Sequence, residues 1–89
     1  MPKKPGKKVV VERVQTGLRI EKRILKVLKA LAEYYEISLG DLVEGIVLHA
    51  FDGKSPFQRP SLERIRALKK IYELELTARD SHNLVEREG

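Results

Sequence analysis

The chain has 89 residues, with 18 Lys or Arg against 13 Asp or Glu, a formal net charge of +5 and no cysteine. This length allows one small domain, which buries only about 60% of the surface that its unfolded chain exposes. Because cysteine is absent, neither a disulfide framework nor a thiolate metal site stabilises so small a core, and oligomerisation is the remaining device. A hydrophobic fraction of 42% excludes a wholly disordered chain.

The apolar runs are short. Val9–Val11 and Gly45–Leu48 fall far below the roughly 20 residues that span a bilayer, so we expect no membrane association. The basic start, residues 1–8, leads into a few valines and then Glu12-Arg13, so we expect no signal peptide. The expected location is therefore the cytoplasm.

The charge is unevenly distributed. Residues 1–29 carry ten basic and two acidic residues, residues 30–53 carry five acidic residues and no Lys or Arg, and residues 54–89 carry eight basic and six acidic residues. A basic pole attracts polyanions and accelerates association with them. The plainer interpretation is a solvated charged surface, and charge alone leaves both open.

Residues 1–8 are rich in Pro, Gly and Lys, which predicts a basic flexible arm. Lys7 and Lys8 in this arm are candidates for contacts to phosphates, or else they only increase solubility. Val9–Ile20 follows with the alternation of a strand. One side carries Val14, Thr16, Leu18 and Ile20, and the other carries Arg13, Gln15, Gly17 and Arg19.

A strand that lies alone cannot satisfy its backbone hydrogen bonds or bury its apolar side. A second copy of the chain would supply the missing strand and produce a two-stranded ribbon. A ribbon whose outer side is polar and basic fits the major groove of DNA. The alternative is an ordinary solvated edge, with Arg13, Gln15 and Arg19 guarding against aggregation.

From Glu21 the period becomes that of a helix, with an apolar stripe that runs to Tyr35. No Ser, Thr, Asp or Asn precedes this helix, so we expect its first turn to lack a side-chain cap. Ser38 and Asp41 then have the spacing of a capping box at the start of a second helix, Leu39–Phe51. Gly53 is the expected left-handed residue after its end.

The second helix is apolar over most of its circumference, which implies a second buried face and a partner chain. The residues that we expect in the dimer interface are Leu18, Ile20, Leu42, Val43, Ile46, Val47 and Phe51.

A Pro-containing linker, residues 54–60, precedes a third helix that we expect Ser61 to cap. Its apolar face continues to Tyr72 and Leu76, and the charged residues from Thr77 onward lack a period. The predicted organisation is a basic arm (1–8), a dimerisation domain (9–53), a linker (54–60), and a C-terminal helix with a charged tail (61–89).

The order of strand, helix, short turn and capped helix from Gln15 to Phe51 resembles the ribbon-helix-helix family of DNA-binding proteins, to which the Arc and methionine repressors belong. The segments that carry the resemblance are Gln15–Ile20, Leu31–Glu33 and Ile37-Ser38. The resemblance implies a mainly α fold: an intertwined homodimer with an intersubunit two-stranded antiparallel β-ribbon, here with an additional C-terminal helix.

By position, the family's base-reading residues correspond to Gln15, Gly17 and Arg19. A Gln side chain can form two hydrogen bonds to adenine, and an Arg side chain can form two to guanine. Gln15 and Arg19 therefore have suitable chemistry for reading bases. Gly17 departs from the pattern because it has no side chain, and Thr16 departs because that inward place is usually apolar. The family also binds a phosphate at the start of its second helix, here Ser38, Leu39 and Gly40. Arg13 is a further expected backbone contact.

The function that follows is sequence-specific binding of double-stranded DNA by a homodimeric transcriptional regulator, a repressor associated with the nucleoid when bound, with higher oligomers forming on DNA. One alternative is an antitoxin-type regulator whose residues 61–76 bind a partner protein. The other is a dimeric interaction module that does not read DNA. No catalytic constellation, metal-ligand spacing or phosphate-binding glycine loop is present, so we expect no enzyme and no cofactor.

Overall fold

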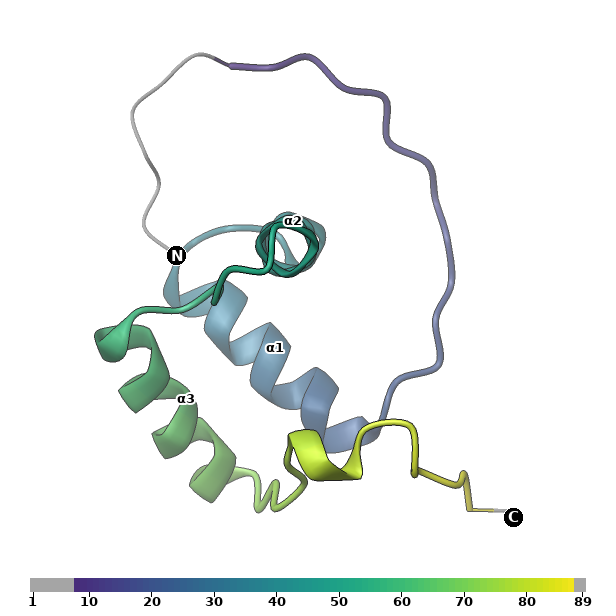
Figure 1. The fold of residues 1–89 in the computed structure, drawn as a ribbon, viewed down its shortest axis with the longest axis vertical. Coiled ribbons are helices and arrows are strands. Elements are labelled where there is room, and N and C mark those ends of the chain that lie inside the picture. The colour runs from purple at the N-terminus through teal and green to yellow at the C-terminus, as the bar shows by residue number, and fades with distance from the viewer. Residues whose placement is uncertain (1–7, 88–89) are drawn as a thin grey trace.

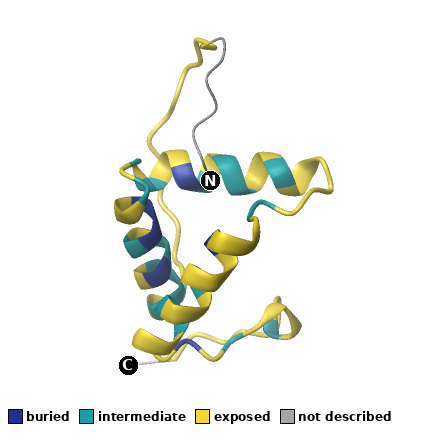
Figure 2. Ribbon diagram, turned by 90° about the vertical axis from the view of Figure 1, so that its left-hand side faces the viewer, coloured by how far each residue is buried: buried dark blue, intermediate teal, exposed yellow. Residues whose placement is uncertain are grey.

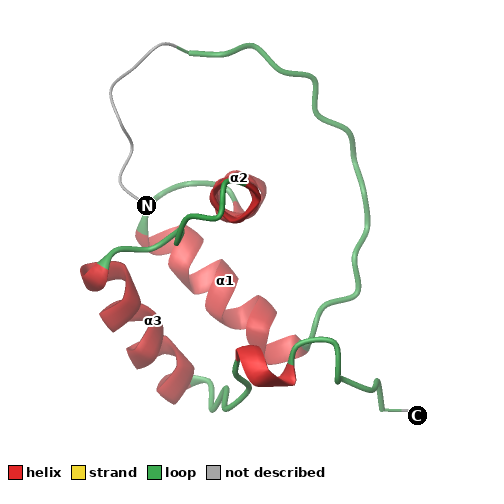
Figure 3. Cartoon of the chain, in the orientation of Figure 1, coloured by secondary structure: helices red, strands yellow, loops and turns green. Residues whose placement is uncertain are grey.

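The computed structural model describes residues 8–87, and within them the chain is a small all-α domain. Its helices are α1 (Lys22–Tyr34), α2 (Leu39–Phe51) and α3 (Arg59–Ile71), followed by a short 3-10 turn, η1 (Ala78–Asp80) (Figure 1). Loops join these elements, and no strand is present among the described residues (Figure 3). Lys7 and the rest of residues 1–7 lie outside the described part.

Helix α1 begins with a side-chain cap, which corrects the expectation that it has none. The Glu21 carboxylate accepts hydrogen bonds from the backbone amides of Arg23 and Ile24, both at 2.9 Å. Two of the amides that a helix start leaves unpaired are thereby satisfied. Glu21 is longer than the Ser, Thr, Asp and Asn side chains that usually cap helices, but its carboxylate performs the same task here.

Helix α2 has the predicted bounds and the predicted cap. Ser38 Oγ accepts from the Asp41 amide at 3.0 Å. A return bond in which the Ser38 amide donates to the Asp41 carboxylate is not among the hydrogen bonds of the described residues, so half of the expected capping box is formed. The inward side chain of this helix is Leu42, which is fully buried.

Helix α3 has its N-cap three residues earlier than predicted and ends at Ile71, well before Leu76. Its N-cap position is Gln58, and Pro60 lies in the first turn, where a missing amide costs little. Ser61 is therefore inside the helix and does not cap it. Ser61 is buried, and its hydroxyl is hydrogen-bonded to the hydroxyl of Tyr35. The linker shortens to residues 54–58.

All three helices end in the same backbone motif, in which the amides of the two residues beyond the helix cap return to its last turn. After α2 the left-handed residue is Gly53 (φ 68°), as predicted. After α1 and α3 that position is occupied by Glu36 (φ 57°) and Glu73 (φ 55°). Glutamate lacks the freedom of glycine there, so these two turns are held by the surrounding packing rather than by intrinsic preference.

Helix α1 is the centre of the domain and packs against both α2 and α3, which do not pack on each other in the described residues (Figure 1). The core consists of Leu31, Ala32 and Leu42, and Figure 2 shows its dark blue turns facing inward on α1. Half-buried apolar side chains surround it: Leu28, Tyr35, Ile37, Ile46, Phe57, Ile65 and Leu68. This is a small core for the length of the chain.

Residues 8–20, called the arm from here on, have neither helix nor strand in the single chain. The arm leaves the start of α1 and arches away from the helices as a wide loop (Figure 1). Every one of its residues is exposed. The predicted strand is thus not formed by one copy alone, because a strand needs a neighbour for its backbone groups.

The single chain is not compact. Its radius of gyration is 14.4 Å, against roughly 12 Å expected for a compact domain of this length. Its accessible surface is 8357 Å², whereas a compact monomer of 10.2 kDa would expose about 5300 Å². Among the described residues, no helix has the length and apolar character to cross a membrane.

Candidate nucleic-acid interface

The three predicted base-reading residues lie on the arm and face solvent. Gln15, Gly17 and Arg19 are all exposed. A Cβ built at Gly17 would meet no heavy atom within 4 Å. The conformation of the single chain therefore does not require glycine at this position, and the space beside it is open.

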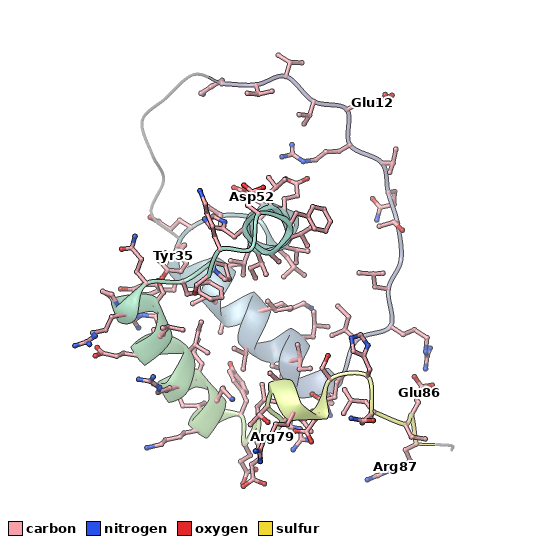
Figure 4. All side chains as sticks on the ribbon, viewed as in Figure 1. Glu12, Tyr35, Asp52, Arg79, Glu86 and Arg87 are labelled. Atoms are coloured by element: carbon pink, nitrogen blue, oxygen red, sulfur yellow. The ribbon has the colours of Figure 1, made fainter. Side chains whose placement is uncertain are left out.

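Arg19 is paired with a carboxylate from the other end of the chain. Its Nε donates to Glu86 Oε1 at 3.0 Å and its Nη2 donates to Oε2 at 2.6 Å. Both side chains remain largely exposed, at 83% and 67%. Figure 4 labels Glu86 on the C-terminal segment, beside the end of the arm that joins α1.

Arg13 is paired in the same manner with helix α2. Its Nε and Nη2 donate to the two carboxylate oxygens of Glu44, both at 2.8 Å. The hydrogen bonds from the guanidinium lower the pKa of Glu44 and raise the pKa of Arg13. The pair is exposed, so it ties the arm to α2 only weakly.

The start of α2 has the geometry of an anion site without a clear excess of positive charge. Ser38 satisfies one of the free amides of the first turn, and the amides of Leu39 and Gly40 have no partner within the helix. Ser38 and Gly40 are exposed, so an anion can approach them. The Asp41 carboxylate in the same turn opposes a phosphate.

Basic side chains continue from the arm onto the first turns of α1. Lys22, Arg23 and Lys26 line a surface depression that also includes Tyr72 near the end of α3. Arg23 is held in place by the Glu21 carboxylate at 3.1 Å and the Glu73 carbonyl at 3.0 Å. The ammonium of Lys26 lies 5.8 Å from the ring centre of Tyr72. The positive surface is therefore broader than the arm.

The residues predicted for the dimer interface divide into three groups by their exposure. Leu42 is buried in the chain's own core, so it packs α2 on α1 and presents no surface to a second chain, which corrects its assignment. Val43 and Ile46 are half-buried. The remaining four expose apolar surface, and they are Leu18, Ile20, Val47 and Phe51.

Two acidic residues at this surface were not expected from the sequence. Glu44 and Glu86 lie 31 and 67 residues from the arginines that they hold, and no local pattern connects residues at such distances. Among the described residues, no group of three or more His, Cys, Asp or Glu side chains could hold a metal ion.

The candidate site thus combines an exposed arm, whose two arginines form ion pairs with carboxylates, with two helix starts. The first turns of α1 carry basic side chains, and the first turn of α2 is accessible to an anion. Comparison of the chain with family models, with curated proteins and with solved structures finds no match.

Proposed function

We propose that this chain is a homodimeric DNA-binding transcriptional repressor of the ribbon-helix-helix type. In this proposal the arms of two copies pair as an antiparallel ribbon, which enters the major groove. Gln15 and Arg19 read base edges, and the start of α2 at Ser38, Leu39 and Gly40 binds a phosphate. Arg13, Lys7 and Lys8 add contacts to the DNA backbone.

The observation that carries the proposal is the large apolar surface that one copy leaves in water. On the arm, Val10, Val14 and Leu18 are 98%, 81% and 74% exposed, and on α2 Phe51 is 80% exposed. The single chain exposes about 3000 Å² more than a compact monomer of its mass would. A standard interface buries about 800 Å² per partner, so a second copy has ample surface to cover.

The charge distribution supports DNA as the ligand of the paired arms. Residues 1–29 carry ten basic residues against two acidic ones. Two such segments would meet at the ribbon and double the local positive charge, which attracts the phosphate backbone.

The position of α3 bears on the antitoxin alternative. Ile65 and Leu68 of α3 pack on the core, and Ser61 is hydrogen-bonded to Tyr35 of α1. A segment that wraps a partner protein is expected to be free until the partner arrives, whereas α3 already packs within its own chain. The DNA-binding regulator is therefore the better supported of these two.

Two measurements test the proposal together. Sedimentation equilibrium at micromolar concentration should give a dimer, and a fluorescence anisotropy titration with mixed duplex DNA should give retention that falls with salt. Sequences selected from random DNA should be partly palindromic. A compact monomer in the centrifuge, or no retention of duplex DNA at low salt, would contradict it.

Two variants separate sequence reading from general attraction. Arg19→Ala should weaken binding to the best selected duplex by about 1–3 kcal/mol and weaken binding to a scrambled duplex far less. Deletion of residues 1–8 should weaken both about equally and reduce the salt dependence. Equal losses on both duplexes for Arg19→Ala would remove the reading role of this residue.

A second candidate is a dimeric interaction module that does not read DNA. The observation that favours it is the pairing of both arm arginines with the chain's own carboxylates, together with a glycine at the middle reading position. The same two measurements distinguish it. A dimer that is not retained on duplex DNA at low salt would select this function.

A further inference from the structure

We propose that Glu86 is a positioning residue that holds the guanidinium of Arg19 in the orientation needed to read guanine. The inference rests on the proposed function, since it assigns a role to Glu86 only if the arm reads DNA. It extends the reading site from the arm to the C-terminal segment, which no part of the sequence pattern connects with DNA.

The ion pair between Arg19 and Glu86 uses only one edge of the guanidinium. Glu86 accepts from Nε and from Nη2, which form one edge of the guanidinium. The planar group has five N–H donors, and the edge formed by Nη1 and Nη2 remains unused by this carboxylate. That remaining edge is a fork of two parallel N–H groups. It matches the O6 and N7 acceptors of guanine.

The C-terminal segment is anchored to the domain upstream of Glu86, whereas residues 81–87 themselves are exposed. Leu74 is buried, and the Glu73 carbonyl accepts from Arg23 Nη1 at 3.0 Å. In η1, the Thr77 amide donates to Asp80 Oδ2 at 2.8 Å, which anchors the turn that leads toward Glu86. Arg19 lies nearer to a fixed point than Glu86 does, because Glu21, which caps α1, follows it by two residues, whereas Glu86 lies six residues beyond Asp80.

The advantage of this contact for DNA binding is preorganisation of the Arg19 side chain. A free arginine side chain loses roughly 2 kcal/mol of rotamer entropy when it is ordered. A carboxylate that already orders the side chain reduces this cost at the moment of binding. Since the pair is largely exposed, its effect is that of a surface ion pair and not that of a buried one.

A competing role is possible for the same contact, and it makes the opposite prediction. Glu86 also cancels a positive charge, so a purely competitive glutamate would weaken binding to every duplex. The two roles therefore differ in discrimination between bases and not in overall affinity. The quantity to measure is the ratio of affinities for the best selected duplex and for the same duplex with its Arg19-dependent guanine replaced by adenine.

The experiment compares Glu86→Gln with the wild-type chain on these two duplexes. The Arg19-dependent guanine is first located as the position at which Arg19→Ala no longer discriminates. We expect Glu86→Gln to reduce the ratio roughly two- to fivefold, the size of an exposed ion pair. In the Arg19→Ala background the same substitution should leave the ratio unchanged.

The matched control is Glu75→Gln, which removes the same charge from an exposed position of the C-terminal segment. It should alter affinity for both duplexes by one common factor. Equal behaviour of the Glu86 and Glu75 variants would overturn the positioning role, and so would tighter binding of Glu86→Gln to both duplexes with an unchanged ratio. Failure of the wild-type chain to bind duplex DNA would instead overturn the proposed function.

Discussion

The helical region, residues 22–71, and the arm, residues 8–20, differ in how far they bury apolar side chains. In the helical region Leu31 and Leu42 are completely or almost completely buried. In the arm Val10 is 98% exposed and Leu18 is 74% exposed. A helix satisfies its backbone internally and needs a neighbour only for one face, whereas a strand needs a neighbour for its backbone as well. One copy of this chain therefore forms its helices and leaves its arm exposed, with neither helix nor strand.

The largest expected effect tests the helical side of this comparison. Leu42→Ala deletes the most buried side chain of α2 and should lower the free energy of unfolding by about 2–5 kcal/mol, measured by chemical denaturation. The control is Leu48→Ala, which truncates an exposed side chain of the same helix and should lower the free energy of unfolding far less. Similar losses for both would show that α2 does not pack on α1 as described.

Leu18→Ala tests the arm. If residue 18 stays exposed, as in the single chain, the substitution should change stability by less than about 0.5 kcal/mol. If a second copy covers it, as we propose, the loss should be about 1.5–3 kcal/mol.

The same measurement has a second readout. The melting temperature of the wild-type chain should rise with protein concentration, because association stabilises the folded state by mass action. A concentration-independent melting temperature, together with a neutral Leu18→Ala, would show that the arm remains solvated.

A smaller effect of opposite sign is expected at the end of α1. Glu36 has a φ of 57°, which glycine adopts without strain. Glu36→Gly should therefore stabilise the chain by about 0.5–1 kcal/mol. Glu33→Gly, three residues earlier on the exposed face of the same helix, should destabilise it by about 1 kcal/mol. The same sign for both substitutions would contradict the backbone conformation described here.

The smallest effect lies at the junction of the two regions. The hydrogen bond from the Ile24 amide lowers the pKa of Glu21 below its ordinary value of 4.5. Its contribution to stability is therefore complete above about pH 4.5 and is lost as the pH falls through the lowered pKa. Glu21→Gln should flatten this part of the stability profile, measured by denaturation at several pH values. An identical profile for both chains would exclude the cap.

The sequence anticipates the features that arise from local chemistry. Ser38 caps α2 and Gly53 ends it, because a hydroxyl before an apolar run and a glycine after it act within a few residues. The predicted start of α3 is wrong because Ser61, a residue type that often caps helices, instead forms a hydrogen bond with the Tyr35 hydroxyl at the end of α1. Glu44 and Glu86 were missed for a related reason, since their partners lie on distant segments.

The valine-rich arm has a consequence for the life of a newly made chain. Val9, Val10 and Val11 form a β-prone run that is open to any unpaired strand, including those of unrelated chains. The charged residues that follow, Glu12 and Arg13, act as gatekeepers against such mispairing. If two copies pair as we propose, cleavage between residues 8 and 20 would report the fraction of chains that remain unpaired, because the arm is fully exposed in the single chain.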